Sequence, residues 1–80
     1  MRVRVRLFAA YREAAGNRYV ELSLQPGARV ADVIAALYAR VPALDTRSGL
    51  IAVNQEYVGP EFPLRDGDEV ALIPPVSGGA

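Results

Sequence analysis

The chain opens with a strict alternation of apolar and polar residues over residues 2–8. The apolar side chains of one face are Val3, Val5 and Leu7. A period of two is typical of a strand with one buried face, and the other face here carries arginines and Phe8. Residues 18–24 alternate in the same way, so the two strands are predicted to form a hairpin. The alanine-rich segment 9–15 between them is predicted to be a short helical connection that ends at Gly16.

The next segment has the spacing of a helix. Its recurring apolar positions are Val30, Val33, Ile34, Leu37 and Val41. We predict one long helix here, which Pro42 ends because proline lacks the backbone N–H. Arg29 stands at the position before the helix, where Ser, Thr or Asp is usual. Asp32 in the first turn is expected to compensate in part through the helix dipole.

Three further strands are predicted in the second half of the chain. The first is the apolar run 50–53, and a turn at Asn54-Gln55 leads into a short return strand over 56–58, since Asn tolerates positive φ. An irregular loop rich in proline and glycine follows. Asp66-Gly67 is a strong turn signal, and residues 69–73 form the last strand.

This order of elements predicts an α+β fold, in which one main helix packs on one face of a mixed sheet. We expect the first and last strands to be parallel neighbours at its centre, as in a β-grasp (ubiquitin-like) roll. The predicted domain covers residues 1–75, and residues 76–80 form a flexible tail. The helix is expected to cover Val3, Val5, Leu7, Val70 and Leu72. Phe8, Ile73 and Tyr57 are then left on the outer face of the sheet.

Composition narrows the classes of function. Eighty residues are enough for one small domain with a single modest core. The chain has no cysteine and no histidine, which excludes disulfides, thiolate chemistry and the commonest metal ligands. Nine basic residues, all arginine, balance nine acidic ones, so nothing indicates nucleic-acid binding. No apolar run approaches the length of a membrane span, and the start does not resemble a signal peptide. The lack of disulfides in so small a domain favours a cytoplasmic protein.

The end of the chain is the most informative segment. It reads Val76-Ser77-Gly78-Gly79-Ala80 and follows the proline pair Pro74-Pro75. Two adjacent glycines cannot pack a core or hold a helix, but they can lie extended in a channel too narrow for side chains. The prolines stiffen and extend the exit from the last strand. We therefore expect the chain to deliver something on its carboxyl end to another protein.

Three segments together carry a resemblance to a known family. They are LFAAYREAAG at 7–16, LIAVNQEYV at 50–58 and LRDGDEVALIPPVSGG at 64–79. These closely resemble sulfur-carrier proteins of the MoaD/ThiS type, the family that includes the small subunit of molybdopterin synthase. The most specific part is DGDEV followed by an apolar pair and PPVSGG.

The resemblance implies a non-catalytic subunit that binds no cofactor itself. A ubiquitin-activating-like adenylyltransferase would use ATP to adenylate Gly79, and sulfur transfer would then form a thiocarboxylate on that residue. The tail would thread into the large subunit of molybdopterin synthase, which is expected to form a heterotetramer with this chain. There the thiocarboxylate would give its sulfur to cyclic pyranopterin monophosphate. Gly78, Ser77 and Pro75 are the implied threading residues.

One residue departs from the family pattern. Members usually end at Gly-Gly, whereas here Ala80 follows Gly79. Either a protease trims Ala80 before adenylation, or this chain is a variant carrier. Trimming is the first hypothesis, because related carriers with extra terminal residues are trimmed by zinc metalloproteases.

Surface residues leave alternatives open. In the family an apolar patch at Phe8, Tyr57 and Ile73 docks onto the large subunit, whereas the alternative is that Phe8 and Tyr57 pack under the loop at 59–63. The outer stripe of arginines is either a solvated strand face or a steering surface for acidic partners. Its members are Arg2, Arg4 and Arg6. The acidic cluster Asp66, Asp68 and Glu69 suggests a metal site, but turn chemistry explains Asp66 and Asp68 better.

The function also has alternatives. A sulfur carrier could serve another acceptor, such as the thiazole of thiamin, a thiolated transfer RNA or a tungsten cofactor. A protein modifier joined to lysines, like ubiquitin, and an interaction domain with an inert tail are two further hypotheses. A thiocarboxylate on the tail would separate carriers from inert domains.

Overall fold

A computed structural model of the protein describes residues 1–42, 44 and 49–74. Its elements in chain order are β1 (Arg2–Leu7), α1 (Ala9–Ala15), β2 (Tyr19–Ser23), α2 (Val30–Arg40), β3 (Leu50–Val53), β4 (Glu56–Tyr57) and β5 (Glu69–Ile73). The predicted tail residues Pro75, Ser77, Gly78, Gly79 and Ala80, with the proposed boundary at 75/76, lie outside the described residues. No helix in the described part is long and apolar enough to cross a membrane.

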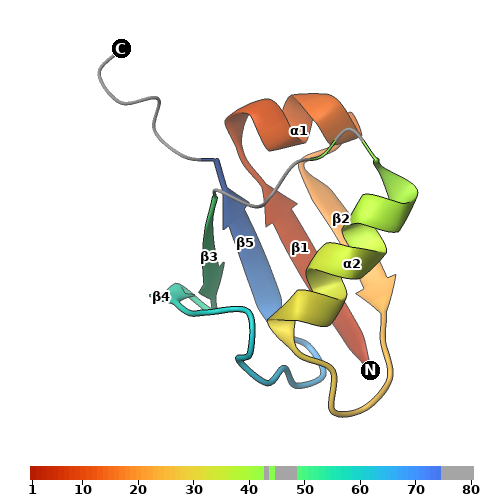
Figure 1. Ribbon diagram of the computed structural model, residues 1–80, viewed down its shortest axis with the longest axis vertical. Coiled ribbons are helices and arrows are strands. Elements are labelled where there is room, and N and C mark those ends of the chain that lie inside the picture. The colour runs from red at the N-terminus through yellow and green to blue at the C-terminus, as the bar shows by residue number, and fades with distance from the viewer. Residues whose placement is uncertain (43, 45–48, 75–80) are drawn as a thin grey trace.

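The five strands form one mixed sheet with the order β2-β1-β5-β3-β4 (Figure 1). β1 and β2 pair antiparallel as the predicted hairpin, and β1 and β5 pair parallel at the centre. β3 runs antiparallel to β5, and β4 folds back along the sheet edge. The architecture is the predicted β-grasp, ubiquitin-like fold.

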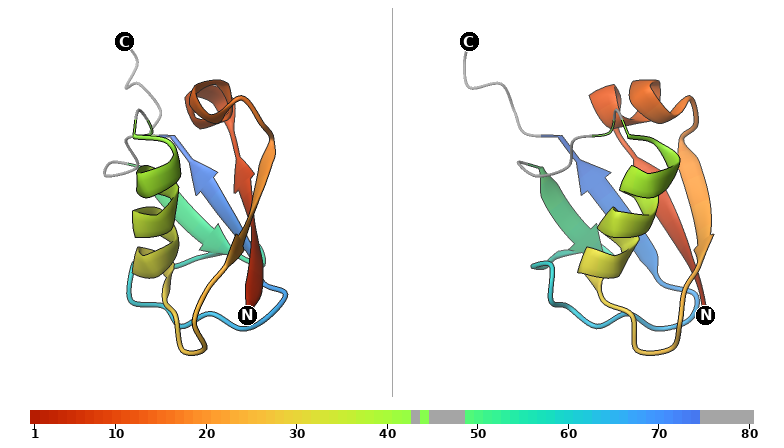
Figure 2. Two further views of the ribbon diagram at one scale, coloured as in Figure 1. Left: turned by 90° about the vertical axis from the view of Figure 1, so that its right-hand side faces the viewer. Right: turned by 45° about the vertical axis from the view of Figure 1, so that its right-hand side comes forward.

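α2 packs across one face of the sheet and forms the second layer (Figure 2). The predicted inner-face residues are all buried beneath it, namely Val3, Val5, Leu7, Val70 and Leu72. The helix contributes three side chains that are 0% exposed, Val30, Val33 and Leu37. The apolar face of the strands and the apolar face of α2 therefore pack against each other and form one core.

The start of α2 is held by other parts of the chain. Backbone N–H groups of Val30 and Ala31 donate to the carbonyl oxygens of Phe62 and Pro60, at 3.0 and 2.8 Å. Asp32 accepts a hydrogen bond from the Arg29 N–H at 2.8 Å. The first turn of a helix leaves its N–H groups without intrahelical partners, and here the loop supplies carbonyls where Arg29 cannot cap.

Strand ends differ from the predictions by one residue. β1 ends at Leu7, because Phe8 serves as the N-cap of α1 with an extended backbone (φ −117°, ψ 152°). β2 and β4 are also shorter than predicted, although Val58 still donates to the Ile51 carbonyl at 2.9 Å. Gly16 ends α1 in the left-handed region (φ 76°), as predicted.

Candidate functional site

The outer face of the sheet, which α2 leaves uncovered, carries an apolar patch. Phe8, Tyr57 and Ile73 lie on this face, as their alternation predicts. Tyr57 is 72% exposed, while Phe8 and Ile73 are half-buried. The docking role assigned to the three residues stays a prediction, but their common face is a structural fact.

Two of these residues lie in one row across the sheet. Ile73 pairs with Leu50 on β3, and continuing the β1–β5 register by one residue brings Phe8 beside Ile73 on its other flank. Tyr57 stands one strand further out, opposite Ala52. Because β5 ends at Ile73, the row lies at the end of the sheet from which the chain continues toward its C-terminus.

The alternative packing of Phe8 and Tyr57 under the loop at 59–63 is wrong. That loop is held against the start of α2 through the carbonyls of Pro60 and Phe62. The exposure of Tyr57 excludes cover by the loop. The ring of Phe8 instead lies under the Arg6 guanidinium, whose Cζ is 4.7 Å from the ring centroid.

Leu50 belongs to this outer face and was not predicted. It is 52% exposed, although it opens an apolar strand that could be buried throughout. Its pairing with Ile73 puts both side chains on the same face. We define the outer patch as Phe8, Leu50, Tyr57 and Ile73. Leu50 and Tyr57 are exposed, and Phe8 and Ile73 are half-buried beside them. A cluster of partly exposed large apolar residues is typical of an interaction surface. This one lies beside the end of β5, where the chain leaves the sheet, which we call the chain exit.

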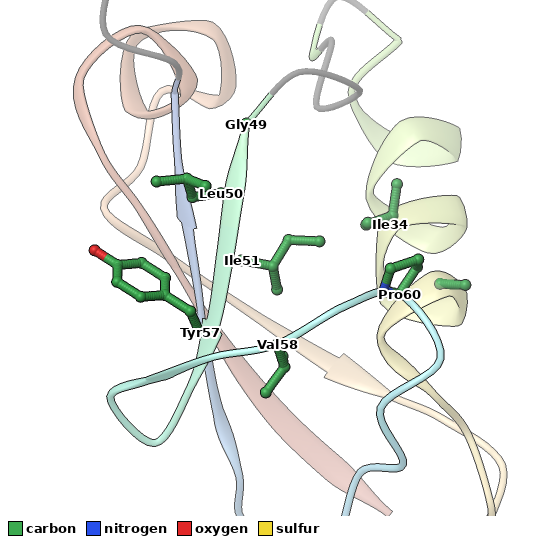
Figure 3. Close-up of a pocket in the computed structure, with 8 residues that line it drawn as sticks. Ile34, Gly49, Leu50, Ile51, Tyr57, Val58 and Pro60 are labelled. Atoms are coloured by element: carbon green, nitrogen blue, oxygen red, sulfur yellow. The ribbon is translucent and has the colours of Figure 1, made fainter.

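A groove runs along the other side of β3, between the strand and α2 (Figure 3). It has a volume of about 440 Å³, and Ile34, Ile51, Val58 and Pro60 are among its lining residues. In the close-up Ile51 points toward α2, whereas Leu50 and Tyr57 point to the opposite side. Leu50 and Tyr57 therefore belong to both surfaces and form the rim where the groove meets the outer patch.

The acidic residues near β5 make turns, as predicted. Asp66 accepts a hydrogen bond from the Arg2 N–H at 2.7 Å, and Asp68 accepts one from the Arg65 N–H at 2.7 Å. Asp68 also accepts from the Asn54 side-chain amide at 3.0 Å. These carboxylates fasten the loop before β5 to β1 and to the β3–β4 turn.

Comparison with known proteins places this geometry in a family. Residues 5–79 match the ThiS family. The chain belongs to the ThiS family. Its members are small sulfur carriers, which agrees with a rigid β-grasp body and a chain exit flanked by an apolar patch.

Two relatives illustrate the range of the family. The molybdopterin synthase sulfur carrier subunit of Chlamydomonas reinhardtii is 46% identical, over 99% of this chain and the whole of the relative. Small archaeal modifier protein 1 of Haloferax volcanii is 38% identical, over 92% of this chain and 97% of the relative.

Solved structures agree with the fold and include complexes. The crystal structure of the Haloferax volcanii modifier SAMP1 superposes with a TM-score of 0.90 at 34% identity, covering 99% of this chain and all of that one. A complex of subunits 1 and 2 of the molybdopterin-converting factor of Helicobacter pylori gives 0.67 at 27% identity, over 99% and 100% of the two chains. The Amycolatopsis orientalis BexX/CysO complex gives 0.71 at 28% identity, over 96% and 99%. ThiS-type chains in these two structures thus stand in complexes with partner proteins.

Proposed function

We propose that this chain is the sulfur carrier of a molybdopterin synthase and bears the sulfur as a thiocarboxylate on Gly79. The observation that carries the proposal is the 46% identity, from end to end, with a molybdopterin synthase sulfur carrier subunit. The chain itself has no cysteine, so any thiol that takes part in the reaction belongs to its partners.

Activation of the tail is the first step. A carboxylate is a poor electrophile, so an oxygen of the Gly79 carboxylate attacks the α-phosphorus of ATP and displaces pyrophosphate. A sulfide equivalent from a donor then attacks the acyl carbon and displaces AMP. The product is a thiocarboxylate, which stays ionised at neutral pH and is a soft nucleophile.

Delivery is the second step. The thiocarboxylate sulfur attacks an oxygen-bearing carbon of the pterin precursor, cyclic pyranopterin monophosphate. A C–S bond forms, the C–O bond at that carbon breaks, and the oxygen leaves with a proton supplied by the large subunit. The sulfur is then bonded to both the precursor and the glycine acyl group as a thioester. Water then cleaves the bond between the acyl carbon and sulfur. Sulfur remains on the precursor, and the carrier regains its carboxylate for another cycle.

The fold supports this use of the tail. β5 is paired on both sides, with β1 and with β3, so its last residue Ile73 is held in a rigid sheet. Gly78 and Gly79 have no Cβ, so a narrow channel can admit them and leave the carbonyl open to attack. Ordering the tail costs about 1–2 kcal/mol per residue, which contacts of the outer patch with the large subunit would offset.

Ala80 sets a condition on the proposal. Adenylation of Gly79 requires a free carboxylate on that residue, so Ala80 must be removed first. We propose that a protease removes it. The mature protein from its native cell should then end at Gly79, and a species that kept Ala80 and still carried sulfur would refute trimming.

The decisive experiment is intact mass spectrometry. The full chain and a form ending at Gly79 are incubated with the adenylyltransferase of the same organism, ATP and a sulfide source. We expect only the Gly79 form to gain the mass of one oxygen replaced by sulfur. Addition of the large subunit and cyclic pyranopterin monophosphate should reverse the gain. If the Gly79 form never gains this mass, the chain is not a sulfur carrier.

A second function is favoured by one specific observation. The chain is 38% identical to a small archaeal modifier protein and superposes closely on the SAMP1 structure. As a modifier, it would join its terminal glycine to lysines of target proteins. The chain has no lysine of its own, so it cannot form chains with itself through side-chain amines. Covalent adducts of high mass in cell extracts, absent when Gly79 is deleted, would support this role.

A further inference from the structure

The stripe of arginines on β1 is divided by the fold into two different surfaces. Arg4 has an acidic cross-strand neighbour on each side, Glu21 on β2 and Glu69 on β5. Together with Arg2 and Asp66, these residues line one polar hollow. Positive and negative side chains are mixed there, so this end of the stripe presents no strong field of one sign.

Arg6 stands in different surroundings at the other end of β1. Its cross-strand neighbours are Tyr19 and Ala71, neither of which is an acidic residue. Arg6 lines a small hollow of about 100 Å³. The other lining residues, from the described part of the chain, are Leu7, Phe8, Arg12, Arg18 and Tyr19. Three arginines and no acidic residue from this part of the chain therefore line the hollow.

These three arginines come from separate elements that only the fold brings together. Arg6 is on β1, Arg12 is on α1, and Arg18 directly precedes β2. We call them the arginine corner. All three are exposed, and the Phe8 ring beneath the Arg6 guanidinium limits the freedom of that side chain. Exposed guanidinium groups are well suited to carboxylates, which they can bind through two parallel hydrogen bonds.

The arginine corner lies beside the chain exit. β1 and β5 are parallel, and Leu7 pairs with Leu72, so Arg6 and Phe8 flank the last residues of β5. α1 lies at this same end of the sheet (Figure 1). A protein that received the C-terminal tail and covered the outer patch would therefore meet the arginine corner at the edge of its contact.

We propose that the arginine corner binds an acidic segment, rich in Asp or Glu, on the protein that receives the tail. The inference rests on the proposed function, since it assumes that the tail is delivered to a partner. Charge complementarity at the rim of an interface speeds association and orients the partners, and salt screens it. The balanced charge of the remaining stripe confines this attraction to one corner and so favours a short acidic segment over an extended polyanion.

The test measures binding of the full chain to the large subunit of molybdopterin synthase from the same organism, the proposed receiver of the tail, at about 50 mM and about 500 mM NaCl. The variant is the double charge reversal Arg12→Glu/Arg18→Glu. The control is a double reversal of the same charge, Arg29→Glu/Arg65→Glu, at exposed arginines outside the corner. We expect the corner variant to bind at least about tenfold more weakly at low salt and within about twofold of the wild type at high salt. The control should stay within about threefold at both.

Several outcomes overturn the inference. The first is a corner variant that binds as tightly as the wild type at low salt. The second is a control variant that loses as much affinity as the corner variant. The third is wild-type binding that does not weaken as the salt concentration rises. Circular dichroism verifies folding, and Arg12→Gln/Arg18→Gln replaces the reversal if it does not fold. The mass measurement on the form ending at Gly79 keeps the two proposals apart. If sulfur is gained and the corner variant binds like the wild type, only the inference fails, whereas absence of sulfur in the wild type defeats the proposed function.

Discussion

The hydroxyl group of Tyr11 fills the space that a side chain at Gly49 would need. A Cβ atom on Gly49 would overlap this hydroxyl and lie 2.7 Å from the carbonyl oxygen of Ile73. α1, the start of β3 and the end of β5 therefore meet at a point that only glycine fits. This contact holds together the end of the sheet that carries the chain exit.

Gly49→Ala is expected to lower the free energy of unfolding by about 1–3 kcal/mol, because the added methyl group must push Tyr11 or the β5 backbone aside. Urea denaturation measures the change. Gly59→Ala is the matched control, since a Cβ there meets nothing within 4 Å. It should change stability by no more than about 0.5 kcal/mol. Equal stability of the two variants would contradict the close packing at Gly49.

Adjacent residues on α2 offer a test of the core. Leu37 is 0% exposed, whereas Tyr38 is 59% exposed. Leu37→Ala should cost about 2–5 kcal/mol through lost burial and a cavity. Tyr38→Ala should change the free energy of unfolding by less than about 1 kcal/mol. Thermal melts of both variants measure the difference, and similar melting temperatures would mean that the helix does not face the sheet as described.

Asn54 joins the β3–β4 turn to β5. It has positive φ (49°), and its side chain donates to Asp68 at 3.0 Å and accepts from the Glu69 N–H at 3.2 Å. Asn54→Gly keeps the backbone freedom and loses only these bonds, at a cost of about 1 kcal/mol. Asn54→Ala also strains the turn and should cost about 1 kcal/mol more. If alanine were the better tolerated of the two in urea denaturation, positive φ would not be what selects this residue.

The outer patch is expected to bind the large subunit of molybdopterin synthase. Tyr57→Asp should weaken that complex by about tenfold or more, because exposed aromatic residues often supply much of the binding energy of an interface. Tyr38→Asp is the control, since Tyr38 is also exposed but lies on α2. Isothermal titration calorimetry measures both affinities. Equal weakening by the two substitutions would remove the outer patch as the binding surface.

Phe8→Asp separates binding from folding. Phe8 is the N-cap of α1, where aspartate can accept hydrogen bonds from the helix N–H groups and offset part of the lost apolar contact. The variant should therefore stay folded, with a stability change of about 1 kcal/mol or less, and still bind the large subunit more weakly. Unfolding of this variant would show that Phe8 is needed for the stability of the fold and does not serve binding alone.

Local patterns predicted the elements well wherever neighbouring residues decide the structure. Alternation identified β1 and its buried face, and helical spacing identified α2. The boundary at Phe8 was missed because an N-cap residue has the extended backbone of a strand residue, and phenylalanine is not among the usual N-cap residues. The hydrogen bonds at the start of α2 could not be predicted from neighbouring residues. The carbonyls that accept from its first backbone N–H groups belong to the distant residues Pro60 and Phe62.

The candidate site was predicted in part. The shared face of Phe8, Tyr57 and Ile73 followed from alternation, but the four residues of β3 are all apolar and carry no period. Only the pairing of Leu50 with Ile73 turns Leu50 outward. The arginines are a similar case. The alternation along β1 placed Arg6 on the same face as Arg2 and Arg4. In the fold, Arg6 instead lines a hollow with Arg12 and Arg18.

The amino-acid sequence alone determined the element types, the composition of the core and the glycine tail, because periodicity, turn residues and missing side chains act over a few neighbouring positions. The tertiary structure alone decided which surface residues stand together. The strand register and the position of α1 at the end of the sheet bring side chains from distant segments to the chain exit. Pairing between distant segments depends on residues far apart in the sequence, so no local pattern predicts it.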